Sequence, residues 1–270
     1  MIKFLKQLFT SSIAITTLVF TFVPEQSFSS FPLNQCIGDD WDILLNRVLV
    51  FLLITSCTFI ALLLYRHFRC FILIKRKNYK IKVEYGDLFS KKHCLKVIAF
   101  DECFTSQVGE QPHEIKAQSI CGQFLMKFPN EDIPSLIAKS GINKCGSKSE
   151  FSKGICYKPG TIVRFDDEYL LLAFAKLDES GLGKMTREEY LSCLFTMWEE
   201  IDKHYNNQDV AIPVFGDGIT RFRDADLSKQ ELVDIIIRSY QLSPYKIKST
   251  LHIVCKESDN FSLNKVEASL

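Results

Sequence analysis

The sequence predicts an α/β fold, with a mixed or parallel sheet covered by helices on both faces, preceded by an all-α hairpin of two transmembrane helices. Two apolar segments near the start of the chain indicate the hairpin. Short runs of β-branched and aromatic residues recur from residue 81 onward, and amphipathic helical patterns lie between them. Strands that alternate with helices favour a sheet of this kind.

The first apolar segment covers residues 8–23 and reads LFTSSIAITTLVFTFV, with Lys3 and Lys6 ahead of it. A signal peptide has the same order of charged and apolar residues. A cleavable signal usually offers small residues at the cut, whereas the bulky stretch FVPE stands here. We therefore expect a retained transmembrane helix over residues 1–23, with a signal peptide as the alternative.

The second apolar segment, residues 48–65, carries no charge and has about the length that a membrane-spanning helix needs. Residues 24–47 are acidic apart from Arg47, which suits an extracytoplasmic loop with this arginine reaching towards the membrane surface. The segment that follows is basic, and the positive-inside rule places it in the cytoplasm. We expect the second helix at residues 48–66 and both chain ends in the cytoplasm. The basic residues after the helix are Arg66, His67, Arg69, Lys75, Arg76, Lys77 and Lys80.

The rest of the chain divides into three expected parts. Residues 67–78 form a basic juxtamembrane linker, either a plain topology signal or a helical continuation at the lipid headgroups. Residues 79–258 form the ligand-binding domain. Residues 259–270 have the polar composition of a disordered tail.

Six strands and two helices are expected in the domain. One helical pattern begins at Thr186, with Glu189 as its capping-box partner, and the other begins at Ser228, with Glu231 as its partner. Glycine and other turn residues bound the strands. The expected strands are residues 81–85, 95–100, 160–165, 169–176, 210–215 and 251–255.

Composition excludes some functions. The formal net charge of the 270 residues is +1, whereas binding to a phosphate backbone leaves a basic footprint, so no nucleic-acid partner is expected. The ten cysteines show no CxxC pair and no Cys/His cluster at zinc spacing, which predicts reduced thiols and no metal site. The histidines form no constellation with a nucleophile, so they are expected to have structural roles.

Two glycine-containing turns suggest a nucleotide site. Gly216 and Gly218 follow an expected strand in VFGDGITRF, where glycines let a backbone approach phosphate. Taken alone, the pattern fits a tight turn equally well. In YGDLF, Gly86 precedes Asp87, whose carboxylate can accept a hydrogen bond from an exocyclic amine or close an Asx turn.

These two turns together resemble the macro domain family, a three-layer α/β/α fold. The resemblance implies that Asp87 binds the adenine amine and that the backbone N–H of Leu88 contacts the ring. It also implies that the glycine loop wraps a diphosphate. Asp217 would oppose the phosphates unless it points away or meets a cationic group. The loop residues so implied are Gly216, Asp217, Gly218, Ile219, Thr220 and Arg221, the last by pairing with phosphate or by a surface role.

The sequence also departs from that family. Many macro domains carry an Asn-Ala-Ala-Asn stretch and a run of glycines after the second strand, whereas FDECF stands here and SICGQF offers only Gly122. No catalytic residue is therefore expected. Asp101 and Glu102 take the place of the usual polar contacts near the distal ribose of ADP-ribose.

A closer resemblance is to the divergent macro domain of the Thoeris bacterial antiphage defence systems, in the form that follows two transmembrane helices. YGDLF, SICGQF, YKPGTIVRFDDEYLLLAFAKLD, IPVFGDGITRF and LHIVCKES carry it. It implies a multi-pass protein of the bacterial inner membrane whose ligand is an ADP-ribose derivative, histidine-ADP-ribose, made by a TIR-domain partner. It also implies no further cofactor, and association into a homo-oligomer that compromises the lipid bilayer.

Two other functions remain open. A membrane-tethered hydrolase of ADP-ribose conjugates would need a carboxylate, from Asp101, Glu102 or Asp217, to position a water molecule. A structural anchor with a degenerate pocket would bind no ligand.

Overall fold

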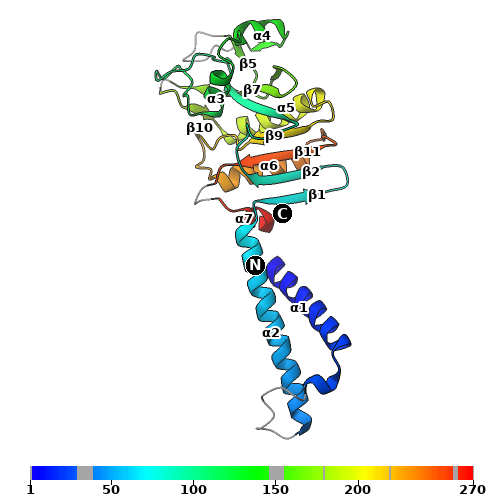
Figure 1. The fold of residues 1–270 in the computed structure, drawn as a ribbon. Coiled ribbons are helices and arrows are strands. Elements are labelled where there is room, and N and C mark those ends of the chain that lie inside the picture. Colours follow the sequence, from blue (N-terminus) through cyan, green and yellow to red (C-terminus); the bar gives the residue numbers. More distant parts are fainter. Residues whose placement is uncertain are drawn as a thin grey trace. The chain divides into compact units, whose positions relative to one another are not determined.

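The chain forms two compact units, Met1–Arg69 and Cys70–Leu270, in a computed structural model (Figure 1). The structure describes residues 2–28, 39–145, 155–178, 180–218, 220–257 and 261–269. Residues 29–38 of the predicted extracytoplasmic loop and part of the predicted tail therefore lie outside the described residues. Each unit is described by itself.

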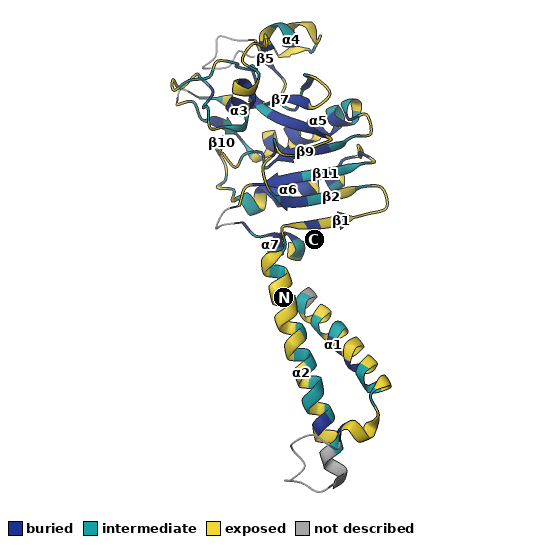
Figure 2. Cartoon of the chain, viewed as in Figure 1, coloured by how far each residue is buried: buried dark blue, intermediate teal, exposed yellow. Residues whose placement is uncertain are grey.

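The first unit is a helical hairpin. Helix α1 (Ile2–Phe22) and the long helix α2 (Asp39–Phe68) lie alongside each other, and a short 3₁₀ helix, η1 (Glu25–Phe28), follows α1 (Figure 1). Two spans, Phe4–Phe22 and Ile43–Phe68, are long and apolar enough to cross a membrane. Large apolar side chains are exposed along both helices (Figure 2). Lipid would accommodate such a surface, whereas water would not.

Specific contacts join α2 to η1 and to the end of α1, near the expected outer end. Asn46 Nδ2 donates to Phe28 O at 2.8 Å. Arg47 Nη2 lies 2.9 Å from Glu25 Oε1, and its guanidinium lies over the Phe20 ring. The arginine predicted to reach the membrane surface thus has a carboxylate partner within its own unit.

The second unit is built on a nine-stranded mixed sheet. Its order is β1-β2-β11-β9-β3-β7-β8-β10, and β6 pairs with β7 beside this path. Strands β2, β11, β9, β3 and β7 run parallel in that order, whereas β1 and β6 pair antiparallel with their neighbours. The strands are β1 (Phe71–Lys75), β2 (Lys80–Tyr85), β3 (Cys94–Asp101), β6 (Ile162–Arg164), β7 (Tyr169–Leu177), β8 (Gly183–Met185), β9 (Asp209–Pro213), β10 (Thr220–Phe222) and β11 (Thr250–Cys255); β4 (Lys144–Cys145) and β5 (Cys156–Tyr157) form a separate pair.

Helices cover both faces of the sheet, as predicted. Helices α5 (Arg187–His204), α6 (Lys229–Leu242) and α7 (Leu263–Ser269) contribute to one apolar core. Helices α3 (Ile120–Lys127) and α4 (Ile133–Lys139) contribute to the other. Successive residues of the central strands alternate between the two cores, as the pleat requires. The predicted three-layer α/β/α architecture is confirmed.

Both predicted helix starts are confirmed. Thr186 Oγ1 accepts from Glu189 N while Glu189 Oε2 accepts from Thr186 N, and Ser228 and Glu231 repeat this capping box before α6. Each box satisfies backbone donors that the helix itself cannot pair.

Three segments differ from the predictions. The basic linker does not continue as a helix, because Phe71–Lys75 pairs with β2 and buries alternate side chains. Strand β10, which the sequence did not predict, lies between Gly218 and the start of α6. The segment after Ser258 is not a disordered tail in its described part, because α7 forms there and buries Leu263 and Val266 in the core.

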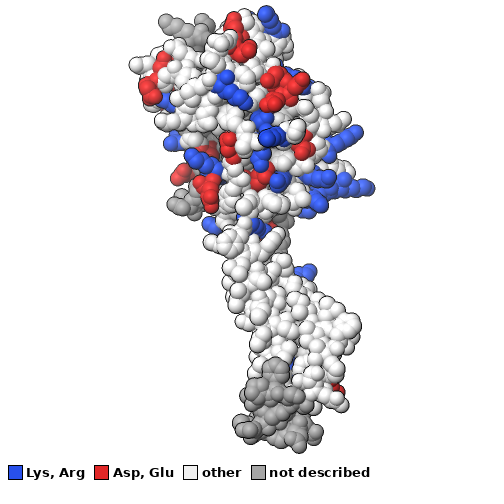
Figure 3. Space-filling view, viewed as in Figure 1, with Lys and Arg blue, Asp and Glu red and all other residues white. Residues whose placement is uncertain are grey.

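Charge is distributed unevenly along the chain. Charged side chains are frequent on the visible surface of the sheet unit, whereas the visible surface of α1 and α2 carries very few (Figure 3). This contrast follows from the apolar composition of the two helices.

Candidate ligand site at the carboxyl edge of the sheet

The fold brings the two glycine-containing turns to one edge of the sheet. Gly86 and Asp87 follow β2, and the glycine loop, defined as residues 215–221, follows β9. Strand β11 lies between β2 and β9 and runs parallel to both, so all three carboxyl ends point the same way. Ligands of open α/β sheets bind at this edge. The two turns are separated by one strand.

Asp87 sits in a local turn. Its Oδ2 accepts from Ser90 N at 3.0 Å, and Ser90 Oγ donates to the Asp87 carbonyl at 2.7 Å. The Asp87 side chain is exposed, whereas Leu88 is buried in the core. The bond spans three residues, as in a helix N-cap, rather than the two of an Asx turn, and it holds the exposed carboxylate at the edge of the sheet.

The two glycines of the glycine loop have different surroundings. Gly216 has φ +88°, which favours glycine, and an added Cβ would lie 3.3 Å from the Phe222 ring. Gly218 does not need glycine for its backbone angle, and an added Cβ would meet no atom within 4 Å. Gly216 is thus required by the turn itself, whereas Gly218 leaves open space beside the backbone. Ile219, a predicted ligand contact, lies outside the described residues.

The carboxylate that would oppose a phosphate has a cationic partner. Asp217 Oδ2 lies 2.8 Å from Lys229 Nζ, and the lysine side chain is only 9% exposed. Lys229 Nζ also donates to the Lys256 carbonyl at 3.1 Å, just after β11. The pair therefore ties the glycine loop to the first residue of α6 and to the neighbouring strand end, and it compensates the charge of Asp217.

The end of the glycine loop is held by its own side chain. Arg221 Nη1 donates to the carbonyl oxygens of Gly218 and Thr220, at 2.9 and 3.1 Å. Arg221 remains exposed and Thr220 half-buried. The start of α6 is poorly suited to phosphate, because the carboxylate of Glu231 lies in its first turn.

Two buried carboxyl groups close β3. Asp101 Oδ1 accepts from Thr105 N at 2.6 Å, and Oδ2 accepts from Thr105 Oγ1 at 2.8 Å. Glu102 is 2% exposed, and its Oε1 is buried without a hydrogen-bond partner in the described structure. Burial raises the pKa of both carboxyls, against the hydrogen bonds from Thr105 at Asp101 and against the charge of Lys176 at Glu102.

A cavity of about 300 Å³ adjoins Glu102. Its wall includes Phe174, whose ring packs on that of Phe215 with centroids 5.6 Å apart. The cavity does not include Asp87, Gly216 or Gly218. Its lining residues are Glu102, Cys145, Lys158, Pro159, Phe174, Lys176, Lys184, Met185, Glu188, Glu189, Ser192 and Cys193.

Three further residues have structural roles. Phe215 is buried, and its carbonyl accepts from Tyr190 Oη at 3.0 Å. Phe222 packs edge-on against Tyr190. An added Cβ on Gly122 would lie 2.2 Å from the Lys116 carbonyl, so this glycine is required by packing in α3.

Sequence reasoning missed three groups. Lys229 had no role assigned, because only the fold brings it to Asp217. The cavity beside Glu102 has no sequence signature. The third group is Cys94, Asp209 and His252, whose ligand atoms lie within 4.8 Å of one another although no spacing in the sequence links them.

The family described as "Thoeris protein ThsA, Macro domain" matches residues 81–256. "Thoeris protein ThsA" of Bacillus amyloliquefaciens (strain Y2) is 29% identical to this chain over 233 residues, which cover 82% of this chain and 76% of that protein. The family match includes the Gly86–Asp87 turn and the glycine loop. It therefore covers both turns of the candidate site.

Solved macrodomains are similar at lower levels. A mutant of the Oceanobacillus iheyensis macrodomain has TM-score 0.47 and 9% identity, over 74% of this chain and 97% of that chain. Another mutant of that macrodomain, with ADPR, has TM-score 0.47 and 10% identity over the same shares. The macrodomain of Thermus aquaticus DarG has TM-score 0.40 and 14% identity, over 66% of this chain and 98% of that chain. These similarities support no assignment of individual residues.

Proposed function

Since the chain belongs to the ThsA macro domain family of Thoeris proteins, we propose that it is a membrane-anchored effector of bacterial antiphage defence. In this proposal the sheet unit faces the cytoplasm of the cell and binds an ADP-ribose-derived signal, histidine-ADP-ribose, made by a TIR-domain partner. Both chain ends are cytoplasmic, and α1 and α2 span the inner membrane. Binding causes chains to associate and the helices to disrupt the bilayer.

The proposal depends above all on the surroundings of the glycine loop. Gly218 leaves open space next to the backbone, and Lys229 compensates the one carboxylate of the loop. Backbone amides can therefore meet a diphosphate without facing an uncompensated negative charge. Asp87 lies one strand away at the same edge, where it would accept from the adenine amine while the Leu88 N–H contacts the ring. Thr220 and Arg221 would complete the phosphate contacts.

The far end of the ligand has a separate candidate place. Asp101 ends β3, Glu102 follows it, and the cavity beside Glu102 is lined by both lysines and glutamates. A ligand that carries a histidine moiety beyond the distal ribose presents both an ammonium and a carboxylate. This cavity offers charges of both signs, which suits such a group.

The coupling to the membrane follows from linkage. A ligand moves an equilibrium only through its different affinities for two states, so the signal must bind more tightly to associated chains than to separate ones. The two apolar helices with their exposed large side chains support a role for the hairpin in lipid. Association would raise the local density of hairpins and destabilise the bilayer.

Calorimetric titration of the full chain in detergent tests the binding step. ADP-ribose, histidine-ADP-ribose and NAD are compared, and the ligands are recovered and analysed afterwards. Tight binding of one ADP-ribose derivative, recovered intact, is expected. The absence of binding to any of the three ligands would contradict the proposal. The membrane step is tested with the full chain in dye-loaded vesicles, where leakage should need the ligand and rise steeply with protein density.

One observation favours a second function, a membrane-tethered hydrolase. Glu102 has a buried carboxylate oxygen without a partner, it lines a cavity, and burial raises its pKa. Such a group can act as an acid or base at neutral pH. Recovery of cleaved ligand in the calorimetric mixture, abolished by Glu102→Gln, would establish the hydrolase.

A further inference from the structure

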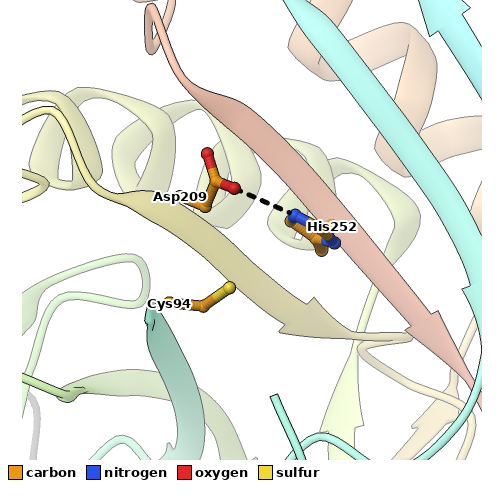
Figure 4. Close-up of side chains that lie close together, drawn as sticks. All are labelled: Cys94, Asp209 and His252. Carbon is orange, nitrogen blue, oxygen red and sulfur yellow. Dashed lines mark hydrogen bonds and ion pairs between the residues drawn. The ribbon is translucent and has the colours of Figure 1, made fainter. Parts of the chain in front are cut away.

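Three side chains from three neighbouring strands lie close together on one face of the sheet. Cys94 begins β3, Asp209 begins β9, and His252 lies near the start of β11 (Figure 4). Strand β9 lies between the other two strands, and Cys94 is in register with Asp209. All three belong to the amino ends of parallel strands. The group therefore lies at the opposite end of β9 from the glycine loop and is separate from the proposed ligand site.

The donor atoms and their separations suit a metal ion. Imidazole nitrogen, thiolate sulfur and carboxylate oxygen are the three kinds of ligand that Zn²⁺ takes in proteins. His252 Nε2 lies 3.4 Å from Asp209 Oδ2, which is long for a hydrogen bond. Two ligands each about 2.1 Å from a tetrahedral ion are about 3.4 Å apart. The observed separation fits two ligands that share one ion.

A fourth side chain orients the histidine. Glu84 Oε1 lies 2.7 Å from His252 Nδ1 and is itself buried. If Nδ1 carries the proton and donates it to Glu84, the lone pair of Nε2 faces the carboxylate of Asp209 and the sulfur of Cys94. A cation between these groups would relieve the repulsion. Metal-binding histidines usually donate their second ring N–H to a carboxylate in this way.

Glu84 does not need the metal to balance its own charge. Lys82 Nζ and Lys91 Nζ lie 2.8 and 2.7 Å from its two oxygens. On the same face, Lys96 Nζ pairs with Glu168 and reaches the Cys94 carbonyl, at 3.2 and 3.4 Å. These lysines compensate the carboxylates of Glu84 and Glu168. Asp209 and Cys94 instead have His252 beside them.

We propose that Cys94 Sγ, Asp209 Oδ2 and His252 Nε2 bind a divalent transition-metal ion, zinc by the chemistry of the ligands, with a water molecule in the fourth position. Binding deprotonates the Cys94 thiol, and the proton leaves to solvent as the sulfur–metal bond forms. The Asp209 side chain is 40% exposed, which leaves a path from solvent. The ion would clamp the amino ends of β3, β9 and β11 together.

The competing interpretation has no metal. A protonated His252 would bridge Glu84 and Asp209 as an ion pair, and Cys94 would be an ordinary buried thiol. The two interpretations differ in one respect that can be measured. Only the metal site involves the sulfur of Cys94.

The test uses the full chain in detergent, stripped with a chelator and titrated with ZnCl₂ or CoCl₂ alone. Cobalt bound to a thiolate gives a near-ultraviolet charge-transfer band. The matched control is Cys121→Ala, because Cys121 is a buried thiol in the same core but outside the group. Wild type and this control should bind one equivalent with the band, and zinc should raise their melting temperature.

Cys94→Ala should lose the band and at least tenfold in zinc affinity. Glu84→Gln should keep the band and weaken zinc binding by about 10- to 100-fold. Asp209→Asn, at the most exposed of the three ligands, gives a second variant if Cys94→Ala fails to fold, and it should also weaken binding at least tenfold. Failure of the wild type to bind a stoichiometric ion, or an unchanged affinity in Asp209→Asn, would overturn the proposal. Neither result depends on ADP-ribose binding.

Discussion

Asp217 Oδ2 lies 2.8 Å from Lys229 Nζ, and this ion pair joins the glycine loop to the first residue of α6. The carboxylate would otherwise face a bound diphosphate. Because Lys229 is largely buried, its amine is held in place rather than free to move into solvent. The pair therefore reduces the electrostatic repulsion between the glycine loop and a bound anion.

The first prediction concerns this pair. Lys229→Ala should weaken binding of the ADP-ribose derivative about tenfold, or about 1.4 kcal/mol, because the charge of Asp217 is then uncompensated. Lys229→Ala combined with Asp217→Asn should recover most of the affinity. Calorimetric titration of both variants measures this. Equal losses in the single and double variants would mean that the charge of Asp217 does not affect the ligand.

The second prediction separates the two glycines. Gly216→Ala should cost about 1 kcal/mol of folding stability or more, because φ is +88° and Phe222 lies close. Gly218→Ala should leave stability within about 0.5 kcal/mol, since its Cβ would enter open space. The same Cβ would occupy space beside a bound phosphate and should reduce ligand affinity at least tenfold. Full affinity in Gly218→Ala would indicate an ordinary turn.

The third prediction concerns pH. Burial raises the pKa of Asp101 in the folded state. Between the unfolded pKa, about 3.9, and the raised folded pKa, the folded state binds more protons, so stability falls as pH rises through this window. Asp101→Asn should remove this fall in stability. The free energies of unfolding of wild type and variant, measured at several acidic pH values, make the comparison.

Asp132→Asn serves as a control of opposite sign. Hydrogen bonds from Ser135 lower the pKa of Asp132 at the start of α4, so its contribution is lost as pH falls through the folded pKa. Identical dependence of stability on pH in wild type and Asp101→Asn would show that burial does not raise the pKa of Asp101.

The fourth prediction concerns the membrane. Leu53 is exposed near the middle of the apolar part of α2, and Tyr65 is exposed near its end. Leu53→Lys should reduce insertion, because lysine at the centre of a spanning helix costs about 2.5–3.5 kcal/mol. Tyr65→Lys should insert normally, because lysine near a helix end reaches the membrane surface. Membrane fractionation of the two variants makes the comparison, and equal recovery in the membrane would argue against a spanning α2.

The fifth prediction concerns the chain end. Leu263 is buried in the core by α7, whereas Lys265 on the same helix is exposed. Leu263→Ala should lower the free energy of unfolding by about 2–5 kcal/mol, and Lys265→Ala should change it by less than about 0.5 kcal/mol. Denaturant unfolding of the two variants measures the difference. Equal stabilities would restore the prediction of a disordered tail.

The sequence by itself determined the elements whose signals are local. Thr186 with Glu189, and Ser228 with Glu231, are capping boxes that close within one helical turn, and both are present as predicted. The central strands were recognisable because they are nearly continuous apolar runs buried on both faces. The two glycine-containing turns were also recognisable in the sequence, and they indicated the family.

Only the tertiary structure decided the pairings between distant residues. Phe71–Lys75 lies within the segment predicted as a basic linker, and it becomes a strand because β2 offers an edge to pair with. Helix α7 is short and polar in composition, and burial of Leu263 against the core holds it. The meeting of Asp217 with Lys229, and of Cys94 with Asp209 and His252, likewise depends on strand order. No periodicity records such contacts, because they follow from which strands lie side by side rather than from the residues between them.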